Sequence, residues 1–429
     1  MNEKLCFDKN FMIGAATSAH QVEGNNRYSD NWVEEHMVNT SYKETSGIAC
    51  DHYNRYEEDI RIMAEAGLNA YRFSIEWARI EPDKGRYDKK EIIHYQDVIH
   101  TCKKYGLEPV VTLHHFTSPK WLMKEGGWES EKTPEYFGKY VRYVCENIGK
   151  ELNYICTINE ANMRLQITAI AERYRKSMLE KGVSENQNRN VQLGIDMKQI
   201  MEKQKAAADE REKVFGIENV ATFLSPGTEK SDLIVMKAHE EARRIIRELC
   251  PQAKVGLTLS LHDLQPMQGA EIQAQMKWNE EFFHYLPYIA EDDFLGVQNY
   301  TRTILNTSGE IPVPEGMEKT QMGYEFYPEA LGHVVRKVTK DFHGELLVTE
   351  NGVAVSEDER RKDFILKALH GIKGCIVDGV PIKGYFYWSL LDNFEFAKGY
   401  DMTFGLVAVD RNTMERTPKP SLAFLGSMR

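Results

Sequence analysis

Two glutamates stand at the ends of apolar segments, where a charged side chain needs a reason. Glu160 closes the segment CTINE, and Glu350 closes the later segment LLVTE. A lone carboxylate in such a place is most often an ion-pair partner or a solvated rim residue. Two carboxylates that face each other can instead divide nucleophilic and acid/base work, which is the arrangement that cleavage of a glycosidic bond requires. Whether these two meet depends on the elements that carry them.

Short apolar segments alternate with longer helical patterns along the chain. The helical pattern of residues 53–67 places Ile60 and Met63 on one face and ends at Gly67, a residue typical of helix C-termini. Eight segments have the length and composition of strands: residues 11–17, 70–75, 108–115, 153–160, 254–261, 293–300, 345–352 and 383–391. Strands that alternate with helices imply βα units and a parallel sheet. Eight of them predict an α/β fold of the closed (β/α)8 TIM-barrel type.

The length of 429 residues is compatible with a single barrel that carries extended βα loops. The stretch from about 175 to 215 breaks the strand–helix rhythm, because it is polar and rich in lysine and glutamate. It is interpreted as a solvated helix inserted in a barrel loop, and a lid over the open end is the alternative. Without an internal repeat or a Gly/Ser linker, residues 1–429 are predicted to form one domain.

Polar residues gather at the carboxyl ends of the predicted strands. In chain order they are Gln21 and Glu23, Arg72 and Glu76, His114 and His115, Asn159 and Glu160, Asn299 and Tyr300, Glu350 and Asn351, and Trp388. In a parallel barrel these ends form the face that holds active sites. Glu160 and Glu350 come from strands three apart in the ring, so they can face each other across the mouth. One would attack or stabilise an anomeric carbon while the other protonates the leaving oxygen.

Composition excludes several classes of partner. The formal net charge of −11 argues against nucleic acid and anionic membrane surfaces. Seven scattered cysteines without a C-x-x-C pair, and an N-terminus without the pattern of a secretory signal, predict reduced thiols and a cytoplasmic location. Since no nucleotide or flavin signature and no transmembrane-length apolar run occur, neither a cofactor nor a membrane span is expected. The oligomeric state stays open.

Several ordered blocks carry a resemblance to a known family. The blocks are QVEG, YRFSIEWARIEP, TLHHF, TINEAN, VTENG, WSLLDNFEF and FGLVAVD. Together they resemble the family 1 glycoside hydrolases, the β-glucosidase type of (β/α)8 barrel, from near residue 11 to near residue 421. The resemblance implies a retaining enzyme that hydrolyses terminal β-D-glycosyl residues through a covalent glycosyl-enzyme intermediate. It makes Glu350 the nucleophile and Glu160 the general acid/base.

The resemblance also implies the rest of the site. The residues that would hold the small-molecule glycoside are Gln21, His115, Asn159, Tyr300, Trp388, Glu395 and Phe396. Arg72 and Tyr300 would contact the nucleophile, and an adjacent cation would favour its ionised form. No metal is implied. The glycone is expected to be glucosyl, with galactosyl and fucosyl as the other possibilities.

This sequence departs from the family at four points. Ala161 replaces the usual proline after the acid, and Gln298-Asn299 precede Tyr300 where the family has other residues. Phe116 and Phe396 stand where the family has tryptophan, whose N–H reaches a glycone hydroxyl there. A slower reaction on plain aryl glucosides is therefore expected. The serine–lysine–tyrosine pattern that binds phosphosugars is not evident after Trp388, which favours an unphosphorylated sugar.

Three other functions compete with hydrolysis. A metal-dependent barrel hydrolase would need a ligand set, but His114 and His115 are neighbours on a strand and point to opposite faces. A barrel that binds a sugar without cleaving it would not need both glutamates. A transglycosylase would use the same covalent intermediate, so the sequence does not separate transfer from hydrolysis.

Overall fold

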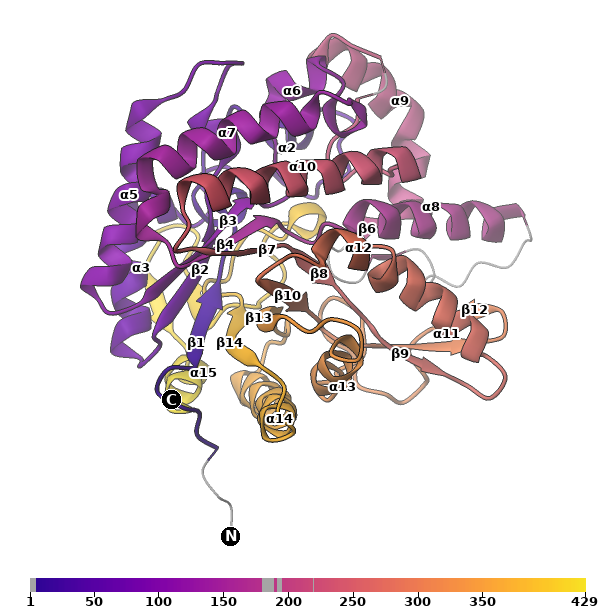
Figure 1. Cartoon of the computed structure of the whole chain (residues 1–429). Helices are drawn as coiled ribbons and strands as arrows, with labels where there is room; N and C mark the ends of the chain where they lie inside the picture. The colour runs from indigo at the N-terminus through magenta and orange to yellow at the C-terminus, as the bar shows by residue number, and fades with distance from the viewer. Residues whose placement is uncertain (1–4, 180–188, 191–194, 219) are drawn as a thin grey trace.

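The protein is described by a computed structural model that covers residues 5–179, 189–190, 195–218 and 220–429 (Figure 1). Its main sheet has nine strands, in the order β7-β4-β3-β2-β1-β14-β13-β10-β8. The strands are β1 (Met12–Ala16), β2 (Ala70–Ser74), β3 (Glu108–His114), β4 (Tyr154–Ile158), β7 (Lys254–Gly256), β8 (Thr258–Ser260), β10 (Phe294–Gln298), β13 (Glu345–Asn351) and β14 (Ile382–Trp388). Every pairing between them is parallel.

Strands β7 and β8 close the ring. Only Leu257 separates them, and β7 pairs with β4 while β8 pairs with β10. They are thus two parts of one interrupted barrel strand, and the fold is a (β/α)8 TIM barrel as predicted. All eight predicted strand segments overlap a barrel strand, because strands buried on both faces are continuous apolar runs that sequence reveals.

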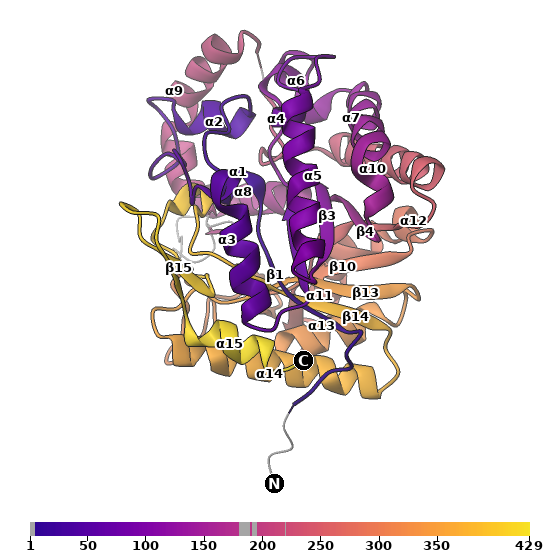
Figure 2. The same cartoon turned by 90° about the vertical axis from the view of Figure 1, so that its left-hand side faces the viewer.

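Helices surround the barrel. The long ones are α3 (His52–Glu65), α5 (Lys89–Lys104), α7 (Thr133–Ile148), α8 (Met163–Leu179), α9 (Met197–Phe215), α10 (Glu229–Leu249), α13 (Ala330–Val338) and α14 (Asp358–Val377). Shorter ones are α1 (Ala19–Val22), α2 (Asp30–Glu35), α4 (Trp77–Ile80), α6 (Lys120–Lys124), α11 (Glu271–Trp278), α12 (Leu286–Ile289) and α15 (Pro420–Gly426). Figure 2 shows α3 and α5 side by side against the strands. None of the described helices is long and apolar enough to cross a membrane.

Local sequence explains where these helices begin and end. Helix α3 buries Ile60 and Met63 as predicted, and the chain leaves it through Gly67 at φ 97°, a value that favours glycine. Helix α10 begins at a capping box in which Thr228 and Ser231 exchange side-chain and backbone hydrogen bonds. Caps of this kind fix the residue at which a helix begins or ends, and so the length of the loop that joins it to the neighbouring strand.

A second sheet extends beyond the barrel. It consists of β9 (Asp263–Pro266), β11 (Arg302–Asn306) and β12 (Gly309–Glu310), in the order β12-β11-β9. Strand β9 follows β8 and β11 follows β10, so this sheet continues the chain past the carboxyl ends of two barrel strands, and β9 pairs with β11 in parallel. It forms one wall beside the mouth of the barrel.

The polar stretch near 175–215 overlaps α8 and α9. Residues 180–188 and 191–194 of that stretch lie outside the described residues, so its extent as an insertion and its use as a lid stay predictions. Helix α9 contacts the loop after α2. The backbone N–H groups of Val38 and Asn39 in that loop donate hydrogen bonds to the Glu210 carboxylate of α9.

Candidate active site

Glu350 lies at the carboxyl end of β13, buried and surrounded by donors. Arg72 Nη1 donates to its Oε1 at 2.6 Å, and the Tyr300 hydroxyl donates to its Oε2 at 2.6 Å. Gln298 Nε2 also donates to Oε1, at 3.1 Å. Hydrogen bonds to a charged acceptor are about twice as strong as neutral ones. These three donors therefore favour the ionised form of Glu350 and fix the direction of its carboxylate.

The turn after Glu350 has a packing reason. A Cβ on Gly352 would lie 1.8 Å from the Trp388 carbonyl oxygen, so only glycine lets β13 leave this close to β14. Asn351 donates from Nδ2 to the Asn299 carbonyl at 2.7 Å and accepts from the Tyr385 hydroxyl at 2.9 Å. These contacts tie β13 to both neighbouring strands, which holds Glu350 in place.

Glu160 follows β4 in an unusual backbone conformation. Its φ is 42°, a left-handed value that costs a non-glycine residue about 1–3 kcal/mol. The backbone is held there by Thr258 of β8, whose hydroxyl accepts from the Glu160 N–H at 2.8 Å and whose carbonyl accepts from the Ala161 N–H at 3.0 Å. Because these hydrogen bonds fix the strained backbone, they also fix the direction of the Glu160 side chain, which is buried in the site.

The two glutamates have unequal electrostatic surroundings. Burial, followed by the charge of Glu350, raises the pKa of Glu160 well above its usual range. Burial also raises the pKa of Glu350, but Arg72, Tyr300 and Gln298 oppose that rise. The first proton taken up by the pair therefore belongs on Glu160. One carboxylate and one carboxylic acid side by side is the combination that acid-assisted displacement needs.

Asn159 connects the pair to the wall of the site. Its Oδ1 accepts from Arg72 Nη2 at 2.6 Å and from Gln298 Nε2 at 2.8 Å. Its Nδ2 lies 3.2 Å from His115 Nε2, which therefore accepts and leaves the ring proton on Nδ1. Burial lowers the pKa of His115 well below its usual value, so the ring stays neutral. Among the described residues the buried His115 Nδ1 has no hydrogen-bond partner.

A third buried carboxyl, that of Glu395, stands at the far end of the site. Glu395 accepts from Trp388 Nε1 at 3.3 Å and from Gln21 Nε2 at 3.2 Å. Burial is the main cause that raises the pKa of Glu395 to about 8. The Phe396 ring follows, stacked 5.9 Å from His20 and edge-on to Phe116 at 5.8 Å. The Trp388 ring stacks on His115 at 5.7 Å, so this end offers flat apolar faces next to groups that bind hydroxyls.

The structure therefore brings together nine of the ten residues predicted for the site within one connected set of contacts, and the tenth, Phe396, lies beside them. The nine are Gln21, Arg72, His115, Asn159, Glu160, Tyr300, Glu350, Trp388 and Glu395, with Phe396 packed against the same wall. Their roles in catalysis and binding remain predictions.

Four polar residues at strand ends serve the fold instead. Glu23 pairs with Arg79 at 2.7 Å, and Glu76 caps α4 through the Ala78 N–H. Asn299 Nδ2 donates to the carbonyls of Leu261 and Thr301, and His114 contacts Ser118 on the side away from His115. Polar residues at the strand ends therefore do not all belong to the site, because loops and outer helices also use these positions. Within the described residues no group of three or more possible ligands could hold a metal ion.

Two contributors were not predicted. Gln298 appeared only as a departure from the family, yet its amide touches both Glu350 and Asn159. Thr258 holds the backbone of Glu160 and donates to Asn159 Oδ1 at 3.2 Å. The sequence signal for Gln298 was a polar side chain at the end of the apolar run FLGVQ. Thr258 gave no signal, because threonine is common in strands.

We expect Tyr300→Phe to lower kcat/KM on an aryl glycoside by about 10- to 100-fold, since a hydrogen bond to a charged group contributes about 1.5–3 kcal/mol. Removing this donor raises the pKa of Glu350 further, so the acidic limb of the kcat/KM profile moves to higher pH. Initial rates across pH measure both effects. The matched control is Tyr324→Phe, whose hydroxyl is 3.5 Å from the Gly352 carbonyl. An acidic limb that stays in place in Tyr300→Phe would contradict this role.

Comparisons with known proteins agree with this geometry. The model of the family described as Glycosyl hydrolase family 1 matches residues 3–311 and 292–429. The chain is 31% identical to Beta-glucosidase A of Thermotoga maritima over 476 aligned positions, covering 98% of this chain and 97% of that protein. Among solved structures, the apo structure of a β-glucosidase 1317 has a TM-score of 0.86 at 38% identity and covers 97% of both chains. β-Glycosidase BGL167 has a TM-score of 0.86 at 39% identity, covering 98% of this chain and 97% of that one.

Proposed function

The chain belongs to glycosyl hydrolase family 1 and is a β-glycosidase, and we propose that it releases terminal β-glucosyl residues by double displacement at Glu350. The observation that carries the proposal is the pair of buried glutamates with unequal electrostatic surroundings, in which the pKa of Glu160 is raised well above its usual range while three donors oppose the rise for Glu350. The names of the similar proteins, several of them β-glucosidases, favour glucose as the sugar.

The first step forms a glycosyl-enzyme. A Glu350 oxygen attacks the anomeric carbon while the bond to the leaving oxygen breaks and the Glu160 proton passes to that oxygen. Arg72 and Tyr300 hold the attacking carboxylate, and Tyr300 also keeps it from rotating away. The charge that repels ionisation of Glu160 lies on Glu350, so neutralising Glu350 by covalent bonding lowers the pKa of Glu160.

The second step restores the enzyme. Glu160, now ionised, takes a proton from water, and the water oxygen displaces Glu350 at the anomeric carbon. Two inversions at one carbon leave the product with the configuration of the substrate. No observation favours transfer to another acceptor over transfer to water.

The glycone would lie between Glu350 and Glu395. Asn159 borders the position next to the anomeric carbon, and the stacked rings of His115 and Trp388 border the glycone. Glu395 and Gln21 would bind the distal hydroxyls. A buried carboxyl at this end disfavours a phosphate group, so the proposed glycone is an unphosphorylated sugar.

One experiment tests this function. Initial rates are measured on nitrophenyl glycosides of several β-linked sugars, and the first-formed anomer is followed by NMR. Fastest turnover of the β-glucoside with β-glucose as the first product is expected. A product of inverted configuration, or no turnover of any glycoside, would contradict the proposal.

Domain organisation and location stay proposals as well. We propose that residues 1–429 form one domain with an insertion near 175–215, supported by a ring that closes from β1 to β14. The seven cysteines are all free, and this supports a reducing, cytoplasmic location.

We expect Phe396→Trp to raise kcat/KM for aryl glucosides by about three- to tenfold, because the indole adds a donor worth roughly 0.5–1.5 kcal/mol. The ring must fit between His20 and Phe116, so thermal melting is measured beside the kinetics. Phe396→Met is the control that alters packing without adding a donor. A Phe396→Trp protein that melts normally and gains nothing on every glycone would contradict the missing-donor explanation.

A further inference from the structure

The segment that carries Glu160 lies beside the interruption in the fifth barrel strand. Strand β7 pairs with β4, whereas β8 pairs with β10 and has no strand on its other side among the described residues. Instead, the chain after β4 runs along that edge of β8. Asn162 Oδ1 accepts from the Ser260 N–H at 3.0 Å, and Asn162 Nδ2 donates to the Ser260 carbonyl at 2.8 Å. Side chains thus make contacts to β8 that the backbone of a paired strand would otherwise make.

One hydroxyl on β8 contacts three residues around the site. Thr258 Oγ1 accepts from the Glu160 N–H at 2.8 Å and from Gln298 Nε2 at 3.2 Å. It also lies 3.2 Å from Asn159 Oδ1. Because the first two partners can only donate, the hydroxyl proton must go to Asn159. A hydroxyl has one proton and two lone pairs, so these three contacts use its whole hydrogen-bonding capacity.

Packing fixes the direction in which this hydroxyl points. Thr258 is fully buried and pairs with Gly296 of β10. A Cβ on Gly296 would lie 2.5 Å from the Thr258 methyl carbon, so the methyl group rests where only glycine leaves room for it. Threonine, branched at Cβ, also has few side-chain rotamers. The methyl group therefore stays over Gly296, and the hydroxyl stays toward Glu160.

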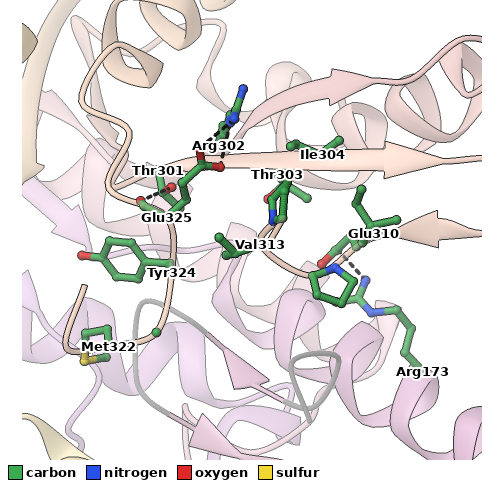
Figure 3. Close-up of a pocket in the computed structure, with 14 residues that line it drawn as sticks. Arg173, Thr301, Arg302, Thr303, Ile304, Glu310, Val313, Met322, Tyr324 and Glu325 are labelled. Carbon is green, nitrogen blue, oxygen red and sulfur yellow. Dashed lines mark hydrogen bonds and ion pairs between the residues drawn. The ribbon is translucent and has the colours of Figure 1, made fainter. Parts of the chain in front are cut away.

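The helix that follows the acid is not close-packed on every side. Helix α8 begins at Met163, and its Arg173 lines a pocket of about 90 Å³ along β11 (Figure 3). Arg173 pairs there with Glu310 at 2.9 Å. Because α8 borders open space at this point, it fixes the direction of Glu160 less directly than the contacts from β8 do.

The backbone of Glu160 depends on the Thr258 hydroxyl. A left-handed φ such as its 42° is unfavourable for a residue other than glycine and persists only where the surroundings hold it. Without the hydroxyl, the buried Glu160 N–H would lose its acceptor, which is unfavourable as well. Asn159 Oδ1 would still accept from Arg72 and Gln298. Loss of the hydroxyl should therefore disturb Glu160 more than Asn159.

We propose that Thr258 is a positioning residue for the general acid, because its hydroxyl holds the Glu160 backbone in the conformation that aims the carboxyl at the leaving oxygen. The inference rests on the proposed function, in which Glu160 is the acid, and adds to it a residue that acts through Glu160. Removing the hydroxyl should accordingly weaken proton donation and leave the attack by Glu350 largely intact.

The test compares two substitutions on substrates with poor and good leaving groups. Thr258→Val keeps the branched shape without the hydroxyl, and Thr258→Ser keeps the hydroxyl without the methyl group. Thr258→Val should lower kcat/KM on octyl glucoside about 10- to 100-fold, less than complete loss of an acid, because Ser260 still hydrogen-bonds the Glu160 side chain. On dinitrophenyl glucoside, whose leaving group needs no proton, kcat/KM should change by no more than about threefold. Thr258→Ser should stay within about threefold of the unmodified enzyme on both substrates.

A double substitution tests whether Thr258 acts through the acid. In a Glu160→Gln enzyme no acid is left to aim, so adding Thr258→Val should lower kcat/KM on octyl glucoside by less than about threefold more. The matched control is Thr157→Val, which removes a buried hydroxyl that lies 2.8 Å from His239 Nδ1 of α10. It should lower the melting temperature without changing the ratio between the two substrates. If Thr258→Val does not fold, Thr258→Ala removes the same hydroxyl with less bulk and is measured in its place.

Three results would overturn the inference. They are equal losses on both leaving groups, a Thr258→Ser enzyme as impaired as Thr258→Val, and a full additional loss in the Glu160→Gln background. A Glu160→Gln enzyme that does not itself distinguish the two leaving groups would instead overturn the acid role in the proposed function. The two failures are therefore distinguishable.

Discussion

Replacing Glu350 with alanine is expected to lower kcat on nitrophenyl glucoside by about 10⁴- to 10⁶-fold, the size of loss that follows removal of a nucleophile. The hydrogen-bond donors of Arg72 and Tyr300, which make the two shortest contacts to this carboxylate, would then point into an empty space large enough for a small anion. Added azide or formate should restore part of the rate. The azide product should have inverted, α configuration, because the anion attacks once from the face that Glu350 occupied. Initial rates and NMR of the product measure both outcomes.

The control for this change lies on the same strand. Glu345 begins β13, pairs with Lys254 at 2.7 Å and stands at the opposite end of the barrel from the site. Glu345→Ala should keep its activity within about twofold. A Glu350→Ala enzyme with undiminished turnover, or a rescued product of retained configuration, would remove Glu350 from the nucleophilic role.

Replacing Glu160 with glutamine is expected to separate good from poor leaving groups. A general acid contributes about 10²- to 10⁴-fold, and it does so only where the leaving oxygen needs a proton. Rates on alkyl glucosides should fall by that factor, whereas the first step with dinitrophenyl glucoside should change by no more than a few-fold. Burst kinetics on the two substrates distinguish that step from the hydrolysis that follows.

The pH dependence of activity tests the acid role of Glu160 independently. Activity rises with pH as Glu350 loses its proton and falls as Glu160 loses its own, at a pKa well above the ordinary value. Since glutamine does not titrate, that alkaline limb should disappear in Glu160→Gln. A remaining fall near pH 8 would report Glu395, whose pKa burial raises to about 8. Equal losses on all leaving groups, with the alkaline limb unchanged, would remove Glu160 from the acid role.

The barrel was predictable because its strands are buried on both faces. Each barrel strand is an apolar run between polar loops, and each lies within a predicted segment except β14, which begins one residue before its segment. The division of the fifth strand around Leu257 was not predicted, because Leu257 continues the apolar run and carries no sign of an interruption. The short strands β9, β11 and β12 were missed for another reason. They are short, and their mixed polar and apolar composition resembles that of a loop.

The site was predictable in its carboxylates and less so in their supports. Glu160 and Glu350 are charges at the ends of apolar strands, and position alone marked them. Glu23 and Glu76 stand at similar places, yet Glu23 forms an ion pair with Arg79 and Glu76 caps the start of α4. Gln298 joins the two halves of the site through a single amide, which only coordinates reveal. The pocket along β11 depends on packing between segments distant in sequence, so no local pattern could indicate it.

The central claim is that Glu350 becomes covalently bonded to the sugar during turnover. Incubation with dinitrophenyl 2-deoxy-2-fluoro-β-glucoside tests it directly, because the fluorine slows both steps while the activated leaving group still lets the first one proceed. Peptide mass spectrometry should then find one fluoroglucosyl group, on the peptide that contains Glu350, with loss of activity in proportion to labelling. A label on Glu160 or Glu395, or an inactivated enzyme that carries no sugar at all, would contradict the account.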